Sequence, residues 1–152
     1  DKEEDKFNKN NVKFCVIGRV EGLPVPIQAR LEKLMKSTYG NTGMTLVLAL
    51  NYGSRNEMID AFKALTRDIR DGRLGLDDID EKRLSGYLYT KNLPDPDLLI
   101  RTSGECRISN FLLWQISYSE LYFTKKLWPD FGKRDLKKAI HEYAQRQRRF
   151  GA

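Results

Sequence analysis

LLIRTSGECRISNFLLWQISYSE, residues 98–120, is the stretch that decides how this chain folds and what it binds. Its apolar start predicts a buried β-strand that delivers Arg101 into the turn 102–104. Arg107 and Ser109 follow shortly afterwards. Guanidinium groups match phosphate oxygens with paired hydrogen bonds, and hydroxyls and free backbone N–H groups add further donors. The stretch therefore predicts an anion pocket, with a phosphate as the ligand, beside the end of a strand.

Each charged residue of this stretch also has a simpler interpretation. The two arginines could be surface residues paired with Glu105 and Asp97. Holding two guanidiniums close together costs repulsion that a bound anion offsets, so ligand binding is favoured. Glu120 follows an aromatic segment, and a carboxylate beside a phosphate site is a natural Mg²⁺ ligand. An exposed position or an ion pair is the alternative for Glu120.

Apolar runs and helical stripes alternate along the chain. The segments between successive predicted strands are long enough for right-handed parallel β-α-β units. The sequence therefore predicts an α/β fold, a mainly parallel β-sheet flanked by helices, in a single domain over residues 1–152. Ligands bind beyond the carboxyl ends of such strands, so loops 51–55 and 101–104 should open on one edge. Strands are predicted at 12–18, 45–50, 97–102 and 120–124, and helices at about 24–39, 55–70, 80–89 and 134–149.

The apolar pattern also predicts which residues are buried. Gly53, Gly72 and Gly104 are expected at turns that need a positive φ. The mixed-charge opening, residues 1–10, is interpreted as a linker or a helix end. Residues expected in the core are Ile27, Leu31, Leu34, Met35, Met58, Phe62, Leu65, Ile69, Trp114, Trp128, Phe131, Leu136, Ile140 and Tyr143.

Composition excludes several classes of protein. The formal charge of +6, from 27 Lys and Arg against 21 Asp and Glu, suits an anionic ligand, membrane surface or nucleic acid without choosing among them. Cys15 and Cys106 form no CxxC motif and are expected as reduced thiols, and His141 is the single histidine. Zinc sites and Ser-His-Asp chemistry are therefore nearly excluded. No apolar run approaches the roughly 20 residues of a membrane span.

The same segments resemble the carboxy-terminal signature of the cis-prenyltransferases, and most closely the undecaprenyl diphosphate synthases (isoprenyl transferases). The likeness runs from about Val12 to Gly151, and so long an ordered set of matches is highly specific. The matching motifs are NYGSR at 51–55, DLLIRTSGE at 97–105, RISNFLLWQ at 107–115, ELYF at 120–123, LWPDF at 127–131 and RFG at 149–151.

This resemblance implies condensation of isopentenyl diphosphate onto an allylic, farnesyl-type diphosphate, with Mg²⁺, to give a long cis-polyprenyl diphosphate lipid carrier. By position, Arg101, Arg107 and Ser109, with the backbone at Ile108, would hold the isopentenyl diphosphate. Cationic donors and Mg²⁺ stabilise the negative charge that develops on a departing diphosphate.

Further roles carry over from the resemblance in the same way. Glu120 would complete the Mg²⁺ coordination, and Arg149 would reach the neighbouring subunit's site in a homodimer. The family implies a cytoplasmic enzyme, peripheral at the membrane, most simply bacterial and alternatively from a plastid. The basic terminal helix fits a peripheral enzyme that hands a lipid to a membrane. No nucleic acid is expected as a partner.

The chain also departs from the family pattern. The amino-terminal phosphate-binding element, Asp-Gly-Asn-Gly-Arg-Trp, is absent, so the expected catalytic aspartate would lie before Asp1 and no catalytic residue is assigned in this chain. The chain therefore resembles the carboxy-terminal portion of a synthase and is expected to be inactive alone. Arg19 stands where the family has an acidic residue, and Ser54 replaces a glycine.

Two other functions remain open at this point. A non-catalytic partner subunit of a heteromeric synthase would explain the missing aspartate element, although it would not need the two arginines. A nucleic-acid-binding module would use the basic terminal helix, but it needs aromatic side chains interleaved with exposed basic ones. The aromatic residues here are predicted as core.

Overall fold

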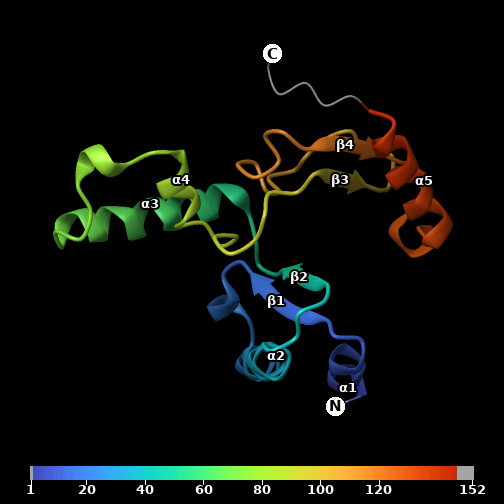
Figure 1. Cartoon of the computed structure of the whole chain (residues 1–152), viewed down its shortest axis with the longest axis horizontal. Coiled ribbons are helices and arrows are strands. Elements are labelled where there is room, and N and C mark those ends of the chain that lie inside the picture. Colours follow the sequence, from blue (N-terminus) through green and yellow to red (C-terminus); the bar gives the residue numbers. More distant parts are fainter. Residues whose placement is uncertain (1, 147–152) are drawn as a thin grey trace. The chain divides into compact units, whose positions relative to one another are not determined.

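The computed structural model describes residues 2–146, with side chains from Glu4 onward. The chain divides into two compact units, Asp1–Asn92 and Leu93–Ala152. Each unit contains one pair of parallel strands together with helices (Figure 1). This combination confirms the predicted α/β class with parallel strands. That the whole chain forms a single domain stays a prediction.

After a short first helix, the first unit forms a β-α-β arrangement, in which helix α2 (Val25–Ser37) connects the two paired strands. Phe14 and Ile17 of the first strand are buried. Thr38, also buried, accepts a hydrogen bond from the Phe14 N–H at 3.1 Å and donates to the Leu34 carbonyl at 2.8 Å, which ties the end of the helix to the strand. The elements are α1 (Lys2–Lys9), β1 (Lys13–Ile17), α2 (Val25–Ser37), β2 (Thr45–Ala49), α3 (Ser54–Arg70) and α4 (Glu81–Ser85).

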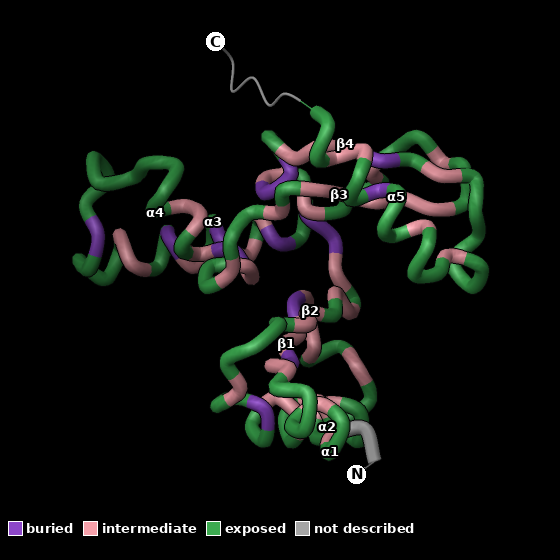
Figure 2. The backbone as a smooth tube through the Cα atoms, turned by 45° about the vertical axis from the view of Figure 1, so that its right-hand side comes forward, coloured by how far each residue is buried: buried purple, intermediate pink, exposed green. Residues whose placement is uncertain are grey.

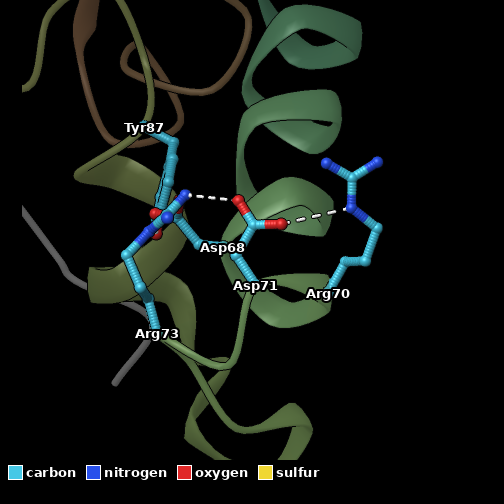
Figure 3. Close-up of polar contacts among 5 residues, drawn as sticks. All are labelled: Asp68, Arg70, Asp71, Arg73 and Tyr87. Atoms are coloured by element: carbon cyan, nitrogen blue, oxygen red, sulfur yellow. Dashed lines mark hydrogen bonds and ion pairs between the residues drawn. The ribbon is translucent and has the colours of Figure 1, made fainter.

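A cluster of charged side chains holds the loop after α3 against that helix. Asp68 accepts hydrogen bonds from Arg73 Nη2 at 2.7 Å and from the Tyr87 hydroxyl at 2.5 Å. Figure 3 shows Asp71 between the guanidinium groups of Arg70 and Arg73, with which it forms ion pairs of 3.2 and 3.0 Å. The cluster joins two segments that Gly72, with a φ of +72°, turns back on one another.

The second unit is built on β3 (Leu98–Arg101) and β4 (Glu120–Phe123). Their register pairs the first residues, Leu98 with Glu120, and the last, Arg101 with Phe123. The connection between them, residues 102–119, is a series of turns without a regular helix. A 3₁₀ turn at Trp128–Asp130 leads into helix α5 (Lys133–Ala144).

Every strand and helix predicted from the sequence is present, with ends shifted by a few residues. Helix α5 ends at Ala144, earlier than predicted, and the mixed-charge opening forms α1. Gly72 and Gly104 have a φ of +72°, as predicted, but Gly53 is extended at −158° and begins α3. Cys15 and Cys106 are both free thiols, as predicted. No helix in the described part of the chain is long and apolar enough to cross a membrane.

The core prediction was wrong for several large residues. The residues that α3 buries are Ser54, Glu57, Ala61 and Leu65, and the residue that α5 buries is Ala139. Leu65 is buried as predicted. Figure 2 shows exposed stretches along the helices and loops of both units. Residues predicted as core and found exposed are Ile27, Phe62, Trp128, Leu136 and Ile140.

Candidate functional site

A cavity of about 430 Å³ lies in the second unit, where β3 ends. Its walls include Arg101, Arg107 and Ile108, three of the residues that the sequence predicts as phosphate ligands. Ser109 joins them because its hydroxyl accepts a hydrogen bond from Arg101 Nη1 at 3.1 Å. The structure therefore brings both arginines to one cavity. The other lining residues are Leu99, Ile100, Thr102, Ser103, Glu105 and Phe111.

The backbone of the turn after β3 is held by the segment that follows β4. The Ser103 N–H donates to the Lys126 carbonyl at 2.7 Å, and the Gly104 N–H donates to the Thr124 carbonyl at 2.8 Å. The expectation of free N–H groups was therefore wrong at these two positions. Ile108 differs, since its N–H has no partner among residues 2–146. An anion in the cavity can use that N–H as a donor.

Arg107 forms an ion pair with Glu105, which also lines the cavity. This is the surface pairing that the sequence offers as the simpler interpretation. The two side chains are 63% and 40% exposed, and exposed ion pairs contribute only about 0–1 kcal/mol. A diphosphate that presents several anionic oxygens can therefore displace the single carboxylate at little cost.

Glu120, the predicted Mg²⁺ ligand, does not lie with the arginines. In the register it stands opposite Leu98, three positions before Arg101, which is about 10 Å along the strand. Alternation along the strands also places Glu120 on the opposite face from Arg101. Its carboxylate instead accepts a hydrogen bond from Arg146 Nη1 at 2.7 Å. The ion pair that the sequence offers as the alternative is thus present, and the role of Glu120 as a Mg²⁺ ligand stays a prediction.

The described residues do not by themselves form a magnesium site. No group of three or more His, Cys, Asp or Glu side chains lies together within the part of the chain that the structure describes. Mg²⁺ uses one or two carboxylates together with substrate phosphates and water. A single carboxylate that is already paired with Arg146 does not fit the ion alone.

In the first unit, polar loops follow both strands and are joined to one another. Asn51 Nδ2 donates to the Arg19 carbonyl at 2.9 Å, and the Arg19 N–H donates to the Asn51 carbonyl at 3.3 Å. Asn51 has a φ of +46°, and in this conformation both its side-chain amide and its carbonyl reach the loop at Arg19. Gly18, before Arg19, has a φ of +111°, and a Cβ there would lie 2.1 Å from the Leu50 carbonyl oxygen.

The side chain of Arg19 anchors this edge to helix α3. Its Nε and Nη2 each donate to one oxygen of Asp60 at 2.8 Å, and the Tyr89 hydroxyl donates to the same carboxylate. The guanidinium, and then the hydroxyl, lower the pKa of Asp60 to about 2. Burial and the neighbouring Asp60 raise the pKa of Tyr89 to about 12. The arginine that departs from the family pattern thus has a structural partner.

A buried carboxylate completes the network. Glu57 is 1% exposed, and it accepts hydrogen bonds from the Tyr52 hydroxyl at 2.5 Å and the Tyr89 N–H at 2.9 Å. The rings of Tyr52 and Tyr89 meet edge to face, with centroids 6.3 Å apart. The sequence analysis did not place Glu57, Asp60 and Tyr89 in one network. The one feature of the sequence that could have indicated this network is the spacing of Glu57 and Asp60, which are three residues apart and so share a helix face.

A larger cavity of about 590 Å³ lies at α4 in the first unit. Lys82, Arg83 and Tyr87 line it together with Asp80. The Asp80 carboxylate caps the helix by accepting a hydrogen bond from the Arg83 N–H at 2.6 Å. The carboxylate of this cavity thus caps a helix, and the cavity of the second unit, which holds the predicted phosphate ligands, is the better candidate for a ligand.

Two predictions about the site are not tested by this geometry. Arg149, predicted to reach a neighbouring subunit, lies outside the described residues. Loops 51–55 and 101–104, predicted to share one edge, belong to different units, and each unit is described by itself.

Known proteins of one family are similar to this chain along nearly its whole length. The family described as "Putative undecaprenyl diphosphate synthase" matches residues 1–151. An isoprenyl transferase of Porphyromonas gingivalis is 53% identical over 142 residues, covering 93% of this chain and 56% of that protein. A tritrans,polycis-undecaprenyl-diphosphate synthase (geranylgeranyl-diphosphate specific) of Thermoplasma acidophilum is 46% identical over 149 residues, covering 98% and 58%.

A solved structure is similar along nearly the whole chain. Lavandulyl diphosphate synthase from Lavandula x intermedia, in complex with dimethylallyl diphosphate, has a TM-score of 0.94 at 38% identity, covering 98% of this chain and 64% of that one. The chain belongs to the undecaprenyl diphosphate synthase family, whose isoprenyl transferases are enzymes that transfer prenyl groups. It spans between half and two thirds of the length of the relatives it matches.

Proposed function

We propose that the protein is a cis-prenyltransferase that condenses isopentenyl diphosphate with an allylic diphosphate to form a long polyprenyl diphosphate. The observation that carries the proposal is the cavity shared by Arg101 and Arg107, with Ser109 hydrogen-bonded to Arg101. Two guanidiniums face one carboxylate there, so the cavity favours a ligand with more than one negative charge. A diphosphate head group meets that requirement.

In this proposal the cavity binds and orients one substrate. Arg101 and Arg107 hold the diphosphate oxygens of isopentenyl diphosphate, and the Ile108 N–H and the Ser109 hydroxyl add donors. The apolar side chains of Leu99, Ile100 and Phe111 line the same cavity and suit an isoprene tail. During condensation the allylic carbon–oxygen bond breaks, diphosphate leaves, a carbon–carbon bond forms and isopentenyl diphosphate loses a proton. The relative bound to dimethylallyl diphosphate supports this substrate class.

The other proposed parts rest on family resemblance. Magnesium, with Glu120 as a ligand, requires that carboxylate to leave Arg146 and meet a diphosphate. When bound, the ion would neutralise charge on the leaving diphosphate. A homodimer in which Arg149 reaches the partner's site, a cytoplasmic location and inactivity of this chain alone are proposals of the same kind. The intact arginine cavity disfavours the alternative of a non-catalytic partner subunit.

The test is binding of isopentenyl diphosphate to the full-length protein with MgCl₂, measured by titration calorimetry. A charge-assisted hydrogen bond contributes about 1.5–3 kcal/mol, so R101Q should raise the Kd about 10- to 150-fold. R30Q, which removes an exposed arginine of α2, is the matched control and should bind like the wild type. Unchanged binding by R101Q and R107Q would refute the assignment of this cavity.

Turnover with radiolabelled isopentenyl diphosphate and farnesyl diphosphate tests the reaction itself. E120Q should raise the Mg²⁺ concentration needed for half-maximal activity if Glu120 is a metal ligand. If Glu120 only pairs with Arg146, E120Q should lower the thermal stability and leave the Mg²⁺ dependence unchanged.

A further inference from the structure

The turn after β3 contains backbone conformations that need support from outside the turn. Ser103 and Gly104 have φ values of +70° and +72°. A positive φ is uncommon for a residue other than glycine, and such a residue keeps it only where its surroundings fix it. Ser103 also lines the arginine cavity and lies between Arg101 and Arg107 in the sequence. The conformation of this turn therefore sets where the two arginines lie relative to one another.

The segment that directly follows β4 supports this turn through its backbone. The Thr124 N–H donates to the Arg101 carbonyl at 2.9 Å, next to the paired strands. The Thr124 carbonyl accepts a hydrogen bond from the Gly104 N–H at 2.8 Å. The Lys126 carbonyl accepts one from the Ser103 N–H at 2.7 Å. Lys126 is therefore the residue whose backbone holds the serine with the positive φ.

The side chain of Lys126 is bound at a second place, at the start of α5. Its Nζ lies 2.9 and 3.1 Å from the two carboxylate oxygens of Asp135. That carboxylate is itself held, because it accepts a hydrogen bond from the Gly132 N–H at 3.0 Å. The Gly132 N–H, and then Lys126, lower the pKa of Asp135, so the carboxylate is ionised at neutral pH. Lys126 thus connects a fixed carboxylate on α5 to the turn that lines the cavity.

We infer that Lys126 and Asp135 are positioning residues for the arginine cavity. Neither belongs to the cavity wall in the described part of the chain. Their ion pair fixes the segment whose carbonyl holds Ser103, so the turn keeps Arg101 and Arg107 ready for one diphosphate. Groups that are already in place lose less conformational freedom on binding, which strengthens affinity. The inference rests on the proposed function, because it takes isopentenyl diphosphate to be the ligand of this cavity.

Exposure limits the size of the effect and supplies a matched control. The side chains of Lys126 and Asp135 are 52% and 22% exposed, and an ion pair of this kind supports a change in Kd of up to about fivefold. Lys138 and Glu142 form another ion pair on α5, with an N–O distance of 3.8 Å. Both partners of that pair belong to the same helix, so its loss should leave the turn unchanged.

The test is binding of isopentenyl diphosphate to the full-length protein with MgCl₂, measured by titration calorimetry. K126Q and D135N should each raise the Kd about three- to fivefold. D135N keeps a side-chain oxygen for the Gly132 N–H, so it removes the charge and not the cap. K126Q/D135N should raise the Kd no further, because both changes remove the same contact. K126R, which can still pair with Asp135, and the control K138Q/E142Q should bind like the wild type.

Two further measurements separate positioning from a general loss of stability. In steady-state turnover, K126Q should raise the KM for isopentenyl diphosphate by the same factor as the Kd, with kcat and the KM for farnesyl diphosphate unchanged. In hydrogen exchange followed by mass spectrometry, a peptide that covers residues 102–104 should exchange about threefold faster in K126Q than in K138Q/E142Q.

The inference is overturned if K126Q and D135N bind isopentenyl diphosphate like K138Q/E142Q. It is also overturned if K126Q lowers the melting temperature while the Kd and the exchange of residues 102–104 stay as in the wild type. R101Q in the same titration distinguishes this failure from a failure of the proposed function. Normal binding by R101Q would refute the proposed function and this inference with it, whereas weak binding by R101Q with normal binding by K126Q would overturn this inference alone.

Discussion

Asn in place of Asp60 should destabilise the first unit by removing the charge that holds Arg19. Both guanidinium donors lie 2.8 Å from the carboxylate, and the two side chains are 35% and 29% exposed. The pKa of Asp60 is lowered from 3.8 to about 2. That difference corresponds to about 2 kcal/mol of unfolding free energy. Because the pair is about one third exposed, screening reduces the expected loss in D60N to about 1–2 kcal/mol.

The sign of the pH dependence follows from the lowered pKa. The ionised carboxylate is favoured in the folded state, so its contribution is fully present above about pH 4. It is lost as the pH falls towards 2, and about half should remain near pH 3. Urea unfolding of the full-length protein, followed by far-ultraviolet circular dichroism at pH 7 and pH 3, measures the difference between wild type and D60N.

D77N provides the control, because Asp77 is exposed and forms no ion pair among the described residues. It should match the wild type within about 0.5 kcal/mol at both pH values. The reasoning is refuted if D60N is as stable as D77N at pH 7, or if its deficit is the same size at pH 3.

Three further substitutions test the local geometry. G18A should lower the stability in thermal unfolding by about 3 kcal/mol or more, because the new Cβ would lie 2.1 Å from a carbonyl oxygen at a φ of +111°. G40A, at a glycine with open space around it, is the control and should be neutral. Equal melting temperatures for the two variants would contradict this. E57A should lower the free energy of unfolding in urea by about 3 kcal/mol, because it leaves the Tyr52 hydroxyl and the Tyr89 N–H without their acceptor, and E57Q should lower it by less. A larger loss in E57Q would contradict the role given to the carboxylate. Y87F should cost about 0.5–1.5 kcal/mol by losing one hydrogen bond, and an unchanged urea midpoint would show that bond to be unimportant.

Local pattern was sufficient for the elements and for the arginine cavity. The apolar run 45–50 and the stripe over 55–70 correspond to β2 and α3, because side-chain period reports which backbone geometry buries an apolar face. Arg101 and Arg107 are close in the sequence and follow a strand end, so a single turn suffices to bring both to one cavity. Placing the two arginines at one cavity therefore needed only neighbours along the chain, although the Thr124 and Lys126 carbonyls hold the turn between them.

Long-range pairing could not be predicted in the same way. Arg19, Asp60 and Tyr89 are separated by tens of residues and meet only because two loops and α3 pack together. The β3–β4 register, which no local pattern specifies, separates Glu120 from Arg101 and places it beside Arg146.

Exposure was the other property that periodicity left open. The stripe on α5 correctly marks an amphipathic helix, but the arc that is buried depends on which neighbour packs against it, and Ala139 rather than Ile140 makes that contact. The sequence by itself therefore determined the strands, the helices and the arginine cluster, since each depends on neighbours along the chain. The tertiary structure alone decided which charges pair and which apolar side chains face outward, because those depend on contacts between segments that the chain order does not specify.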